Sequence, residues 1–542
     1  GILHYNYGSY PGSNNITVHD RIKNIKKKPG AIWSPDSKKI LTYKLDEREV
    51  KELHVIQSVT EDEENLRPKL FSYRYHLPGD EHIPKAYMYI CDIENKTCTE
   101  IDTDPLYINF TSPYTEDYKK ANWLKDGSKV YFTRLSRDFK EAEFKILDTT
   151  TLEVKTVIKE KSDTFLFYDS FSSGDGYDDY GFSNRLLEDG KHIIWQSERD
   201  GWAHFYLYDA ETGELINQIT KGEWSVRNLA HIDEKEEWMY FTAGGREEGR
   251  DPYYLHFYRV KLDGTELELL TPEDANHSIS LSPNKDYFVD TYSRVDLPPK
   301  TVLRAIDGTL ITTIEEANID KLLQIGYILP ERFVVKASDG ITDLHGIMIK
   351  PANFDETKQY PLIDYIYGGP QTINTPKSFT WKGYEGSSYL GGLQSFAQLG
   401  FLGIIMDGLG TPQRSKKIHD YCYKNLEGCA GLEDHFICTQ ELGKRFNFID
   451  IERIGLWGAS GGGYATVRAM LEYPHFYKVG VAASGNHDQR LYNAAWVERY
   501  NGLFDKEVYL KQDNTKLAKN LKGKLLNPPW LFRLRQTFGP VA

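Results

Sequence analysis

The chain contains one serine in a setting suited to attack on a carbonyl group. Residues 458–462 read Gly-Ala-Ser-Gly-Gly, which is a G-x-S-x-G turn. The apolar run Ile454–Trp457 has strand length, and apolar residues recur at helical spacing from the turn to Pro474. This strand–turn–helix order is typical of a nucleophile elbow, whose glycines allow a very tight turn that lifts the serine clear of the sheet. The pattern therefore predicts Ser460 as a nucleophile.

A serine nucleophile also needs donors that stabilise the oxyanion formed during attack. The backbone N–H of Gly461, the residue after the serine, is the first candidate donor. The second is the hydroxyl of Tyr367, because a Gly-Gly-Pro sequence follows this tyrosine and its glycine pair allows close approach of the chain. A core tyrosine beside an ordinary Gly-Gly-Pro turn is an equally good interpretation of the same residues.

The elements that precede this region are short strands. From residue 1 to about residue 330, turns such as Ser-Pro-Asp-Ser-Lys-Lys and Asp-Gly-Ser-Lys recur, each followed by β-branched or aromatic residues. Regular short strands with such turns and almost no helical periodicity favour β-propeller blades over a sandwich or a solenoid. The segments that carry the repeat begin at Trp33, Trp123, Leu187 and Leu281, with second hairpins at Leu207 and Val260.

The pattern changes after Pro330. Apolar strand-like runs now alternate with helical stretches, as at residues 361–367, 401–406, 454–457 and 479–483. Buried parallel strands have this character, and together with the elbow they predict an α/β-hydrolase domain over residues 331–542. Residues 331–350 would form its leading hairpins.

Several short motifs occur in order and together resemble a known family. They are Tyr-Gly-Gly-Pro at 367–370, Asp-Gly-Leu-Gly-Thr at 407–411, Gly-Leu-Glu-Asp-His at 431–435, the elbow, Glu-Arg-Tyr-Asn-Gly at 498–502 and, upstream, Ser-Glu-Arg-Asp-Gly-Trp at 197–202. This set resembles the prolyl oligopeptidase family, and most closely its dipeptidyl peptidase IV branch, over nearly the whole chain.

The resemblance implies a serine peptidase whose propeller caps the hydrolase and admits short peptides, cleaved after Pro or Ala near the N-terminus. By position, Ser460 would be the nucleophile, and Tyr367 with the Gly461 amide the oxyanion hole. Tyr492 and Trp496 would line the pocket for a proline or small residue, and aromatic faces do pack well on a pyrrolidine ring. Packing on one helix face at i, i+4 spacing explains the same two aromatic residues without a pocket.

The sequence departs from the family pattern in three places. The family's Asp and His follow the serine, but residues 527–542 contain no Asp, Glu or His, and neither His475 nor His487 suits the order of the triad. The glutamate pair that holds a substrate amine in this branch is not found in residues 10–32. At least one blade would precede Gly1. We therefore expect an incomplete propeller over residues 1–330, a hydrolase without its C-terminal strands, and little peptidase turnover by this 542-residue chain.

Composition narrows the range of partners. The net charge of −13 argues against nucleic acid. A serine mechanism needs no cofactor, and no cysteine pair has metal-ligand spacing. Cys91 and Cys98 flank a hairpin-like turn, so a cross-strand disulfide and two free thiols are equally expected. The family resemblance favours an exported, periplasmic or extracellular location and leaves a homodimer and a membrane anchor open.

Two other functions stay open from the sequence. The chain could be a non-catalytic binding protein that uses its propeller and hydrolase surfaces, or an esterase or acyl-aminoacyl hydrolase on the same scaffold. The intact elbow favours an enzyme, because a binding protein has no need of a strained serine turn.

Overall fold

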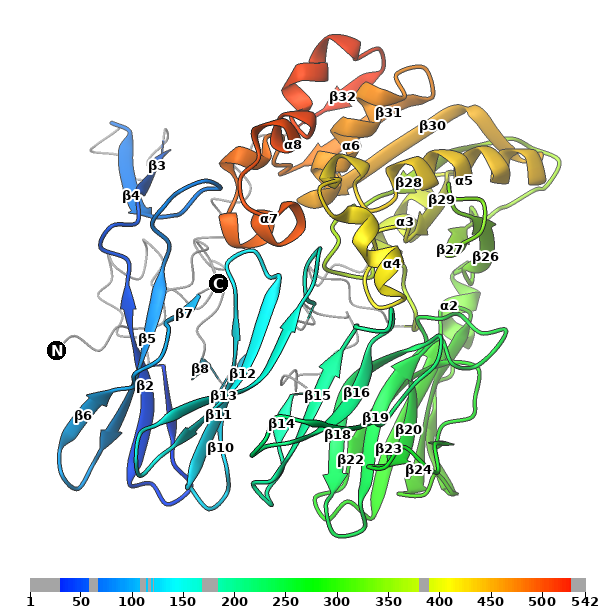
Figure 1. The fold of residues 1–542 in the computed structure, drawn as a ribbon. Coiled ribbons are helices and arrows are strands. Elements are labelled where there is room, and N and C mark those ends of the chain that lie inside the picture. Colours follow the sequence, from blue (N-terminus) through cyan, green and yellow to red (C-terminus); the bar gives the residue numbers. More distant parts are fainter. Residues whose placement is uncertain are drawn as a thin grey trace.

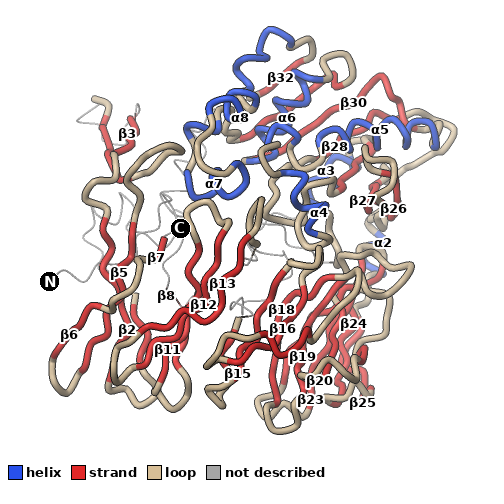
Figure 2. The backbone as a smooth tube through the Cα atoms, in the orientation of Figure 1, coloured by secondary structure: helices blue, strands red, loops and turns tan. Residues whose placement is uncertain are grey.

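The structure is a computed structural model that describes residues 30–57, 67–107, 114–115, 118–119, 121–167, 184–379 and 389–527. The chain forms two bodies, one built from strands and one in which helices surround a sheet (Figure 1). Figure 2 shows that helices gather almost entirely in the second body. The predicted combination of a β-propeller and an α/β-hydrolase is confirmed.

The first body consists of antiparallel sheets that form the propeller blades. The first blade contains β1 (Ala31–Trp33), β2 (Lys39–Asp46), β5 (Lys85–Asp92), β6 (Thr97–Glu100) and β7 (Leu106–Tyr107). The second contains β10 (Ala121–Trp123), β11 (Lys129–Leu135), β12 (Glu141–Asp148) and β13 (Val154–Lys161), and the third β14 (Arg185–Leu186), β15 (His192–Ser197), β16 (His204–Asp209) and β17 (Leu215–Gln218). The fourth contains β18 (Ser225–Asp233), β19 (Trp238–Gly244), β20 (His256–Lys261) and β21 (Glu268–Leu269), and the fifth β22 (Asn276–Leu281), β23 (Tyr287–Arg294), β24 (Leu297–Ala305) and β25 (Leu310–Glu316). Two separate hairpins are β3 (Glu52–Gln57) with β4 (Lys69–Arg74) and β8 (Tyr114–Thr115) with β9 (Tyr118–Lys119).

The repeated turns are the first hairpins of the blades. In the second blade, Trp123 pairs with Val130 across the predicted turn, in which Gly127 takes a φ of +73° and the Asp126 carboxylate accepts from the Ser128 amide. The fourth blade has no such sequence signal. Its β18–β19 turn reads Asp-Glu-Lys-Glu-Glu, and Glu237 occupies the left-handed position at φ +57° that glycine usually takes.

Two of the cysteines lie on neighbouring strands of the first blade. Cys91 on β5 lies directly opposite Cys98 on β6, and the two form a disulfide. The cross-strand disulfide is therefore the correct one of the two interpretations of this pair. Cys422, Cys429 and Cys438 are free and buried in the second body.

The second body contains a seven-stranded sheet in the order β26-β27-β29-β28-β30-β31-β32, preceded by the short helix α2 (Asp320–Gln324). The antiparallel hairpin at one edge is the leading hairpin expected from the sequence, and β29, β28, β30, β31 and β32 are mutually parallel. The strands are β26 (Glu331–Lys336), β27 (Asp343–Ile349), β28 (Tyr360–Tyr365), β29 (Leu402–Met406), β30 (Ile449–Ala459), β31 (Tyr477–Ala483) and β32 (Lys524–Leu526).

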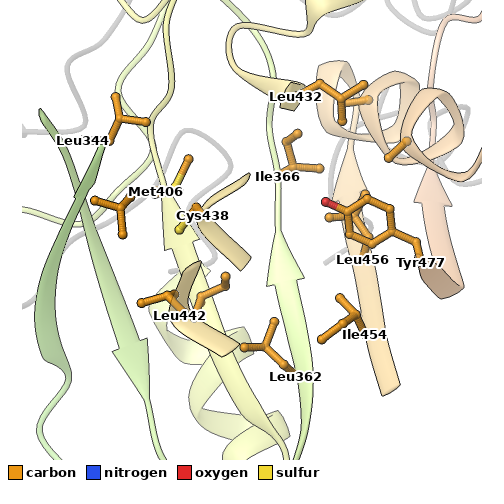
Figure 3. Close-up of a cluster of buried hydrophobic side chains, with 14 of the residues drawn as sticks. Leu344, Leu362, Ile366, Met406, Leu432, Cys438, Leu442, Ile454, Leu456 and Tyr477 are labelled. Carbon is orange, nitrogen blue, oxygen red and sulfur yellow. The ribbon is translucent and has the colours of Figure 1, made fainter. Parts of the chain in front are cut away.

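Helices flank this sheet. They are α3 (Tyr389–Gln398), α4 (Lys416–His419), α5 (Leu432–Arg445), α6 (Gly461–Glu472), α7 (Ala494–Asn501) and α8 (Lys506–Lys511), with 3-10 turns η1 (Asp420–Cys422), η2 (Leu426–Gly428), η3 (Gln489–Leu491) and η4 (Asn514–Asn520). Figure 3 shows the core that joins sheet and helices, in which Leu362, Ile454 and Leu456 of the strands face Leu432 and Leu442 of α5. No helix in the described part of the chain is long and apolar enough to cross a membrane.

The propeller supports helix α7 directly. Arg137, in the β11–β12 turn, donates from Nε and Nη2 to the two carboxylate oxygens of Glu498 on α7, at 2.6 and 2.7 Å. The Glu498 side chain is fully buried, and the amide of Gly79 also donates to it at 3.3 Å. The Ala494 amide at the start of α7 donates to the carbonyl of His76. The propeller therefore fixes both the start and the middle of this helix.

Candidate active site

Ser460 sits at the junction of β30 and α6 with a strained backbone. Its φ and ψ are +57° and −116°, although it carries a side chain. Its amide donates to the carbonyl of Ala483 on the neighbouring strand, and its carbonyl accepts from the Tyr464 amide of α6. These two bonds fix the turn from both sides. Ser460 therefore lies at the carboxyl end of a central parallel strand and at the N-terminus of a helix, where amide groups favour developing negative charge.

The elbow glycines are required by close backbone contacts. A Cβ on either Gly458 or Gly462 would lie 2.2 Å from the carbonyl oxygen of Ile366, and one on Gly463 would lie 2.4 Å from that of Ala483. Backbone atoms have no room to move away from such contacts. Packing this tight explains why the Gly-Ala-Ser-Gly-Gly sequence was an informative signal.

Tyr367 follows β28 and points its hydroxyl into the same region. Its side chain is buried, and its oxygen accepts a hydrogen bond from the Nε2 of Gln371 at 3.1 Å. A Cβ on Gly369 would lie 2.4 Å from the Tyr367 ring and 2.8 Å from the Gln371 amide oxygen, so the glycine makes room for this pair. Gln371 was missed by sequence reasoning because a glutamine after a Gly-Gly-Pro turn has no distinctive pattern.

Tyr492 and Trp496 form an aromatic wall. Their rings meet edge to face, with centroids 5.5 Å apart and planes at 89°. Trp496 lies on α7, but Tyr492 ends the 3-10 turn η3 before that helix begins. The two rings therefore do not share one helix face, because only Trp496 is helical, and both also pack against the buried cluster that includes Val497 and Tyr500.

One cavity of about 50 Å³ brings these residues together. All five residues predicted from the sequence contribute to its wall: Tyr367, Ser460, Gly461, Tyr492 and Trp496. Sequence reasoning missed three polar residues of the same wall, which are Ser484, Asn486 and Gln489 from the loop after β31. The remaining lining residues are Gly368, Gly369, Gln371, Leu426 and Tyr464.

The described lining of this cavity contains no imidazole and no charged side chain. His487 is not among the lining residues. It stacks on Tyr464 with ring centroids 6.4 Å apart, and its ring nitrogens lie 3.3 and 3.4 Å from the side-chain amides of Asn514 and Asn527. His475 lies between α6 and β31. The family pattern places a glutamate pair within residues 10–32, of which residues 10–29 lie outside the described part of the chain. Residues 528–542 of the tail lie outside it as well.

A buried histidine fixes the turn after Tyr367. The Nε2–H of His419 donates to the carbonyl of Pro370 at 2.8 Å, and the rings of Phe165 and Phe167 meet the imidazole edge to face at 4.9 and 4.7 Å. Burial lowers the pKa of His419 to about 3, so the ring is neutral near pH 7. Two propeller phenylalanines therefore help to position the segment that carries Tyr367.

A second histidine forms a buried pair away from the cavity. The Nδ1 of His435 on α5 lies 2.9 and 3.0 Å from the carboxylate oxygens of Asp364 on β28. Burial opposes charge on the imidazole, but the facing carboxylate raises the pKa of His435. Neither residue contributes to the cavity wall. The pair ties α5 to the strand that precedes Tyr367.

One group of three residues in the described chain has the spacing of metal ligands, namely Glu273, His277 and Asp290 in the fifth blade. A guanidinium already provides the positive charge there. Arg304 donates to Glu273 at 2.5 Å and to Asp290 at 3.1 Å, and His277 contacts Asp290 at 2.8 Å. The cluster is an ion-pair network in which His277, Asp290 and Arg304 are buried and Glu273 is partly exposed.

Comparison with known proteins covers both bodies. Residues 25–299 match the model of the dipeptidyl peptidase IV N-terminal region, and residues 388–532 match the model of the prolyl oligopeptidase family. A dipeptidyl peptidase 4 of Trichophyton tonsurans is 27% identical over 426 residues, which are 74% of this chain and 51% of the relative. A dipeptidyl peptidase 4 of Arthroderma otae is 30% identical over 348 residues, 61% of this chain and 42% of the relative.

The fold matches solved structures as well. The crystal structure of Porphyromonas gingivalis dipeptidyl peptidase 4 has a TM-score of 0.76 and 20% identity, over 99% of this chain and 71% of that one. The chain spans about half the length of the curated relatives it matches.

Proposed function

Because the chain belongs to the prolyl oligopeptidase family, in its dipeptidyl peptidase IV-like branch, we propose that it carries the active site of a serine peptidase acting on short peptides. Residues 1–330 would form the propeller domain and residues 331–542 the catalytic domain. The observation that supports the proposal most is the single cavity shared by the strained Ser460, the Gly461 amide and the Tyr367 hydroxyl.

Each residue then has a defined role. The Oγ of Ser460 attacks the substrate carbonyl carbon, the scissile C–N bond breaks, and the amine leaves with the proton that the serine loses. Water then hydrolyses the resulting acyl-enzyme to a carboxylic acid and free Ser460. The Gly461 amide and the Tyr367 hydroxyl donate to the carbonyl oxygen as it becomes negative. Tyr492 and Trp496 pack against the residue that carries this carbonyl, which we take to be proline or a small residue. The cavity volume of about 50 Å³ supports a small residue, since a single water needs roughly 10–15 Å³ on this measure.

Proton transfer from Ser460 requires a base, and the described lining of the cavity holds no imidazole. We therefore expect the 542-residue chain to turn over peptides slowly. An oxyanion hole and substrate binding without the base retain only about 10³–10⁴-fold catalysis over water. Robust cleavage of an Ala-Pro or Gly-Pro chromogenic substrate, lost on Ser460→Ala substitution, would refute this expectation.

A fluorophosphonate probe tests the proposed function without a need for turnover. We expect covalent modification over hours, mapped by peptide mass spectrometry to Ser460 and not to Ser484, the other serine of the cavity. The Ser460→Ala variant should remain unlabelled, and Tyr367→Phe should label more slowly because it loses an oxyanion donor. A folded chain that never reacts would instead favour the binding-protein alternative.

A further inference from the structure

The cavity beside Ser460 has a second wall whose chemistry differs from the aromatic one. Asn486 and Gln489 lie on the loop between β31 and α7, and both line the cavity together with the rings of Tyr492 and Trp496. The Asn486 Nδ2 donates to the Gln489 Oε1 at 3.1 Å. This contact uses one N–H and one oxygen lone pair. The two amides hold more donors and acceptors than that.

The remaining groups of this pair have no partner in the described chain. Neither the Oδ1 of Asn486 nor the Nε2 of Gln489 makes a hydrogen bond with any described residue. If both side-chain amides were flipped, Gln489 would donate to Asn486 instead. One residue would still keep an unpaired N–H and the other an unpaired oxygen. The wall therefore offers one donor and one acceptor next to each other whichever way the amides are placed.

The loop that carries this wall is fixed. Asp488 accepts from the Arg490 amide at the start of η3, and the guanidinium of Arg490 bonds the Asp488 carboxylate at 2.8 and 2.6 Å and that of Asp513 at 3.2 Å. Gln489 itself is only 4% exposed. An amide held in place recognises a partner at a small entropic cost.

Building on the proposed function, and narrowing its preference for proline or a small residue to small polar residues, we propose that this amide wall makes Asn486 and Gln489 specificity residues. They select a small uncharged side chain that both donates and accepts a hydrogen bond. Serine, threonine and asparagine have this property, and proline, alanine and valine do not. The absence of charged groups in the described lining disfavours lysine, arginine and the acidic residues. The aromatic wall packs on the carbon atoms of the same side chain.

Threonine and valine provide the sharpest comparison, because they have nearly the same shape and differ in one hydroxyl. The full 542-residue chain is titrated with the dipeptide amides Ala-Thr-NH₂, Ala-Val-NH₂ and Ala-Pro-NH₂ by isothermal calorimetry. We expect the threonine ligand to bind about tenfold more tightly than the valine ligand, the difference that one paired hydrogen bond typically gives. The proline ligand should bind no better than valine.

Substitutions of similar shape assign this preference to the wall. Asn486→Leu and Gln489→Met keep the volume and remove the amides, so they should abolish the threonine preference and strengthen valine binding. Gln359→Met is the matched control, since Gln359 is an exposed residue just before the amino end of β28, outside the cavity lining, and it donates to the Asn447 carbonyl. It should leave all three affinities unchanged.

The outcomes separate this proposal from the function on which it rests. Equal affinity for the threonine and valine ligands, or a preference that survives in the double Asn486→Leu/Gln489→Met variant, would overturn the amide wall while leaving a peptidase site intact. If no dipeptide binds and the fluorophosphonate also fails to label Ser460, the peptidase proposal falls as well. A stable fold in each variant is checked by its urea unfolding midpoint.

Discussion

Replacing Arg137 with methionine tests whether the propeller supports the pocket through α7. The substitution leaves the fully buried Glu498 carboxylate with the Gly79 amide, at 3.3 Å, as its hydrogen-bond donor. A buried ion pair that loses one partner typically costs 3–5 kcal/mol, because the other charge remains desolvated. We expect a loss of about that size at pH 7. The Arg137→Met/Glu498→Met double variant should recover about 2–4 kcal/mol of it, since two apolar side chains can replace the pair.

The loss of unfolding free energy caused by Arg137→Met should also depend on pH in a defined direction. Burial raises the pKa of Glu498 already in the unaltered chain, and Arg137 opposes that shift. Without the guanidinium, the folded-state pKa rises further above its unfolded value of roughly 4.3. A group with a raised folded pKa stabilises the fold below the unfolded value and loses this contribution as pH rises. The difference between Arg137→Met and the unaltered chain should therefore be small near pH 4 and largest above pH 7.

Urea unfolding followed by tryptophan fluorescence gives the free energies, and hydrogen exchange of residues 494–501 reports α7 itself. The matched control is Arg48→Met, which removes a similar two-bond pair with Asp46 from a side chain that is 83% exposed. That control should leave the midpoint unchanged because solvent screens exposed pairs. If Arg137→Met is as stable as the control, or the double variant is no better than the single one, the propeller does not support the helix in this way.

Three further changes test the site. Gln371→Met should slow fluorophosphonate labelling about tenfold by releasing the Tyr367 hydroxyl, whereas the rate should not change if the glutamine has no positioning role. Gly462→Ala should lower the free energy of unfolding by about 3 kcal/mol or more in urea, because the new Cβ would lie 2.2 Å from a backbone oxygen. The control Gly455→Ala should be tolerated, because the nearest atom to its Cβ would be 3.7 Å away. Equal unfolding midpoints for the two variants would contradict the contact argument. The folded-state pKa of His419 is lowered to about 3, so the unfolded state binds a proton at higher pH than the folded state does. The free energy of unfolding should therefore fall as pH drops from about 6.5 toward 3. The His419→Gln variant should show a shallower fall in urea midpoints measured from pH 7 to pH 4.

Much of the fold is predictable because its signals are local. Turn residues marked the first hairpins of four blades, and apolar runs marked four parallel strands of the hydrolase sheet. The missed hairpin is β18–β19, whose turn Asp-Glu-Lys-Glu-Glu contains neither Ser-Pro nor Gly. Ser37, Glu237 and Lys285 all take positive φ in first hairpins, but only the turns of Ser37 and Lys285 carry a recognisable Ser-Pro signal.

The site was predictable only where its residues belong to a local sequence motif. Ser460 and Gly461 belong to a motif whose tight contacts demand particular residues. Asn486 and Gln489 reach the cavity through the course of one loop, and neither their type nor their spacing indicates it. Trp496, which the resemblance places at the pocket, lines the cavity, but nothing in the local sequence connects it to the propeller turn that supports its helix.

The support of α7 by the propeller has a consequence for the order of folding. The Arg137–Glu498 contact joins residues 361 positions apart, which places it among contacts that form late. The propeller is translated first and domains generally fold as units, so α7 would emerge onto a docking surface that already exists. Maturation of the pocket would then be the last step, and a slow phase that appears in Trp496 fluorescence after propeller folding is its expected kinetic signature.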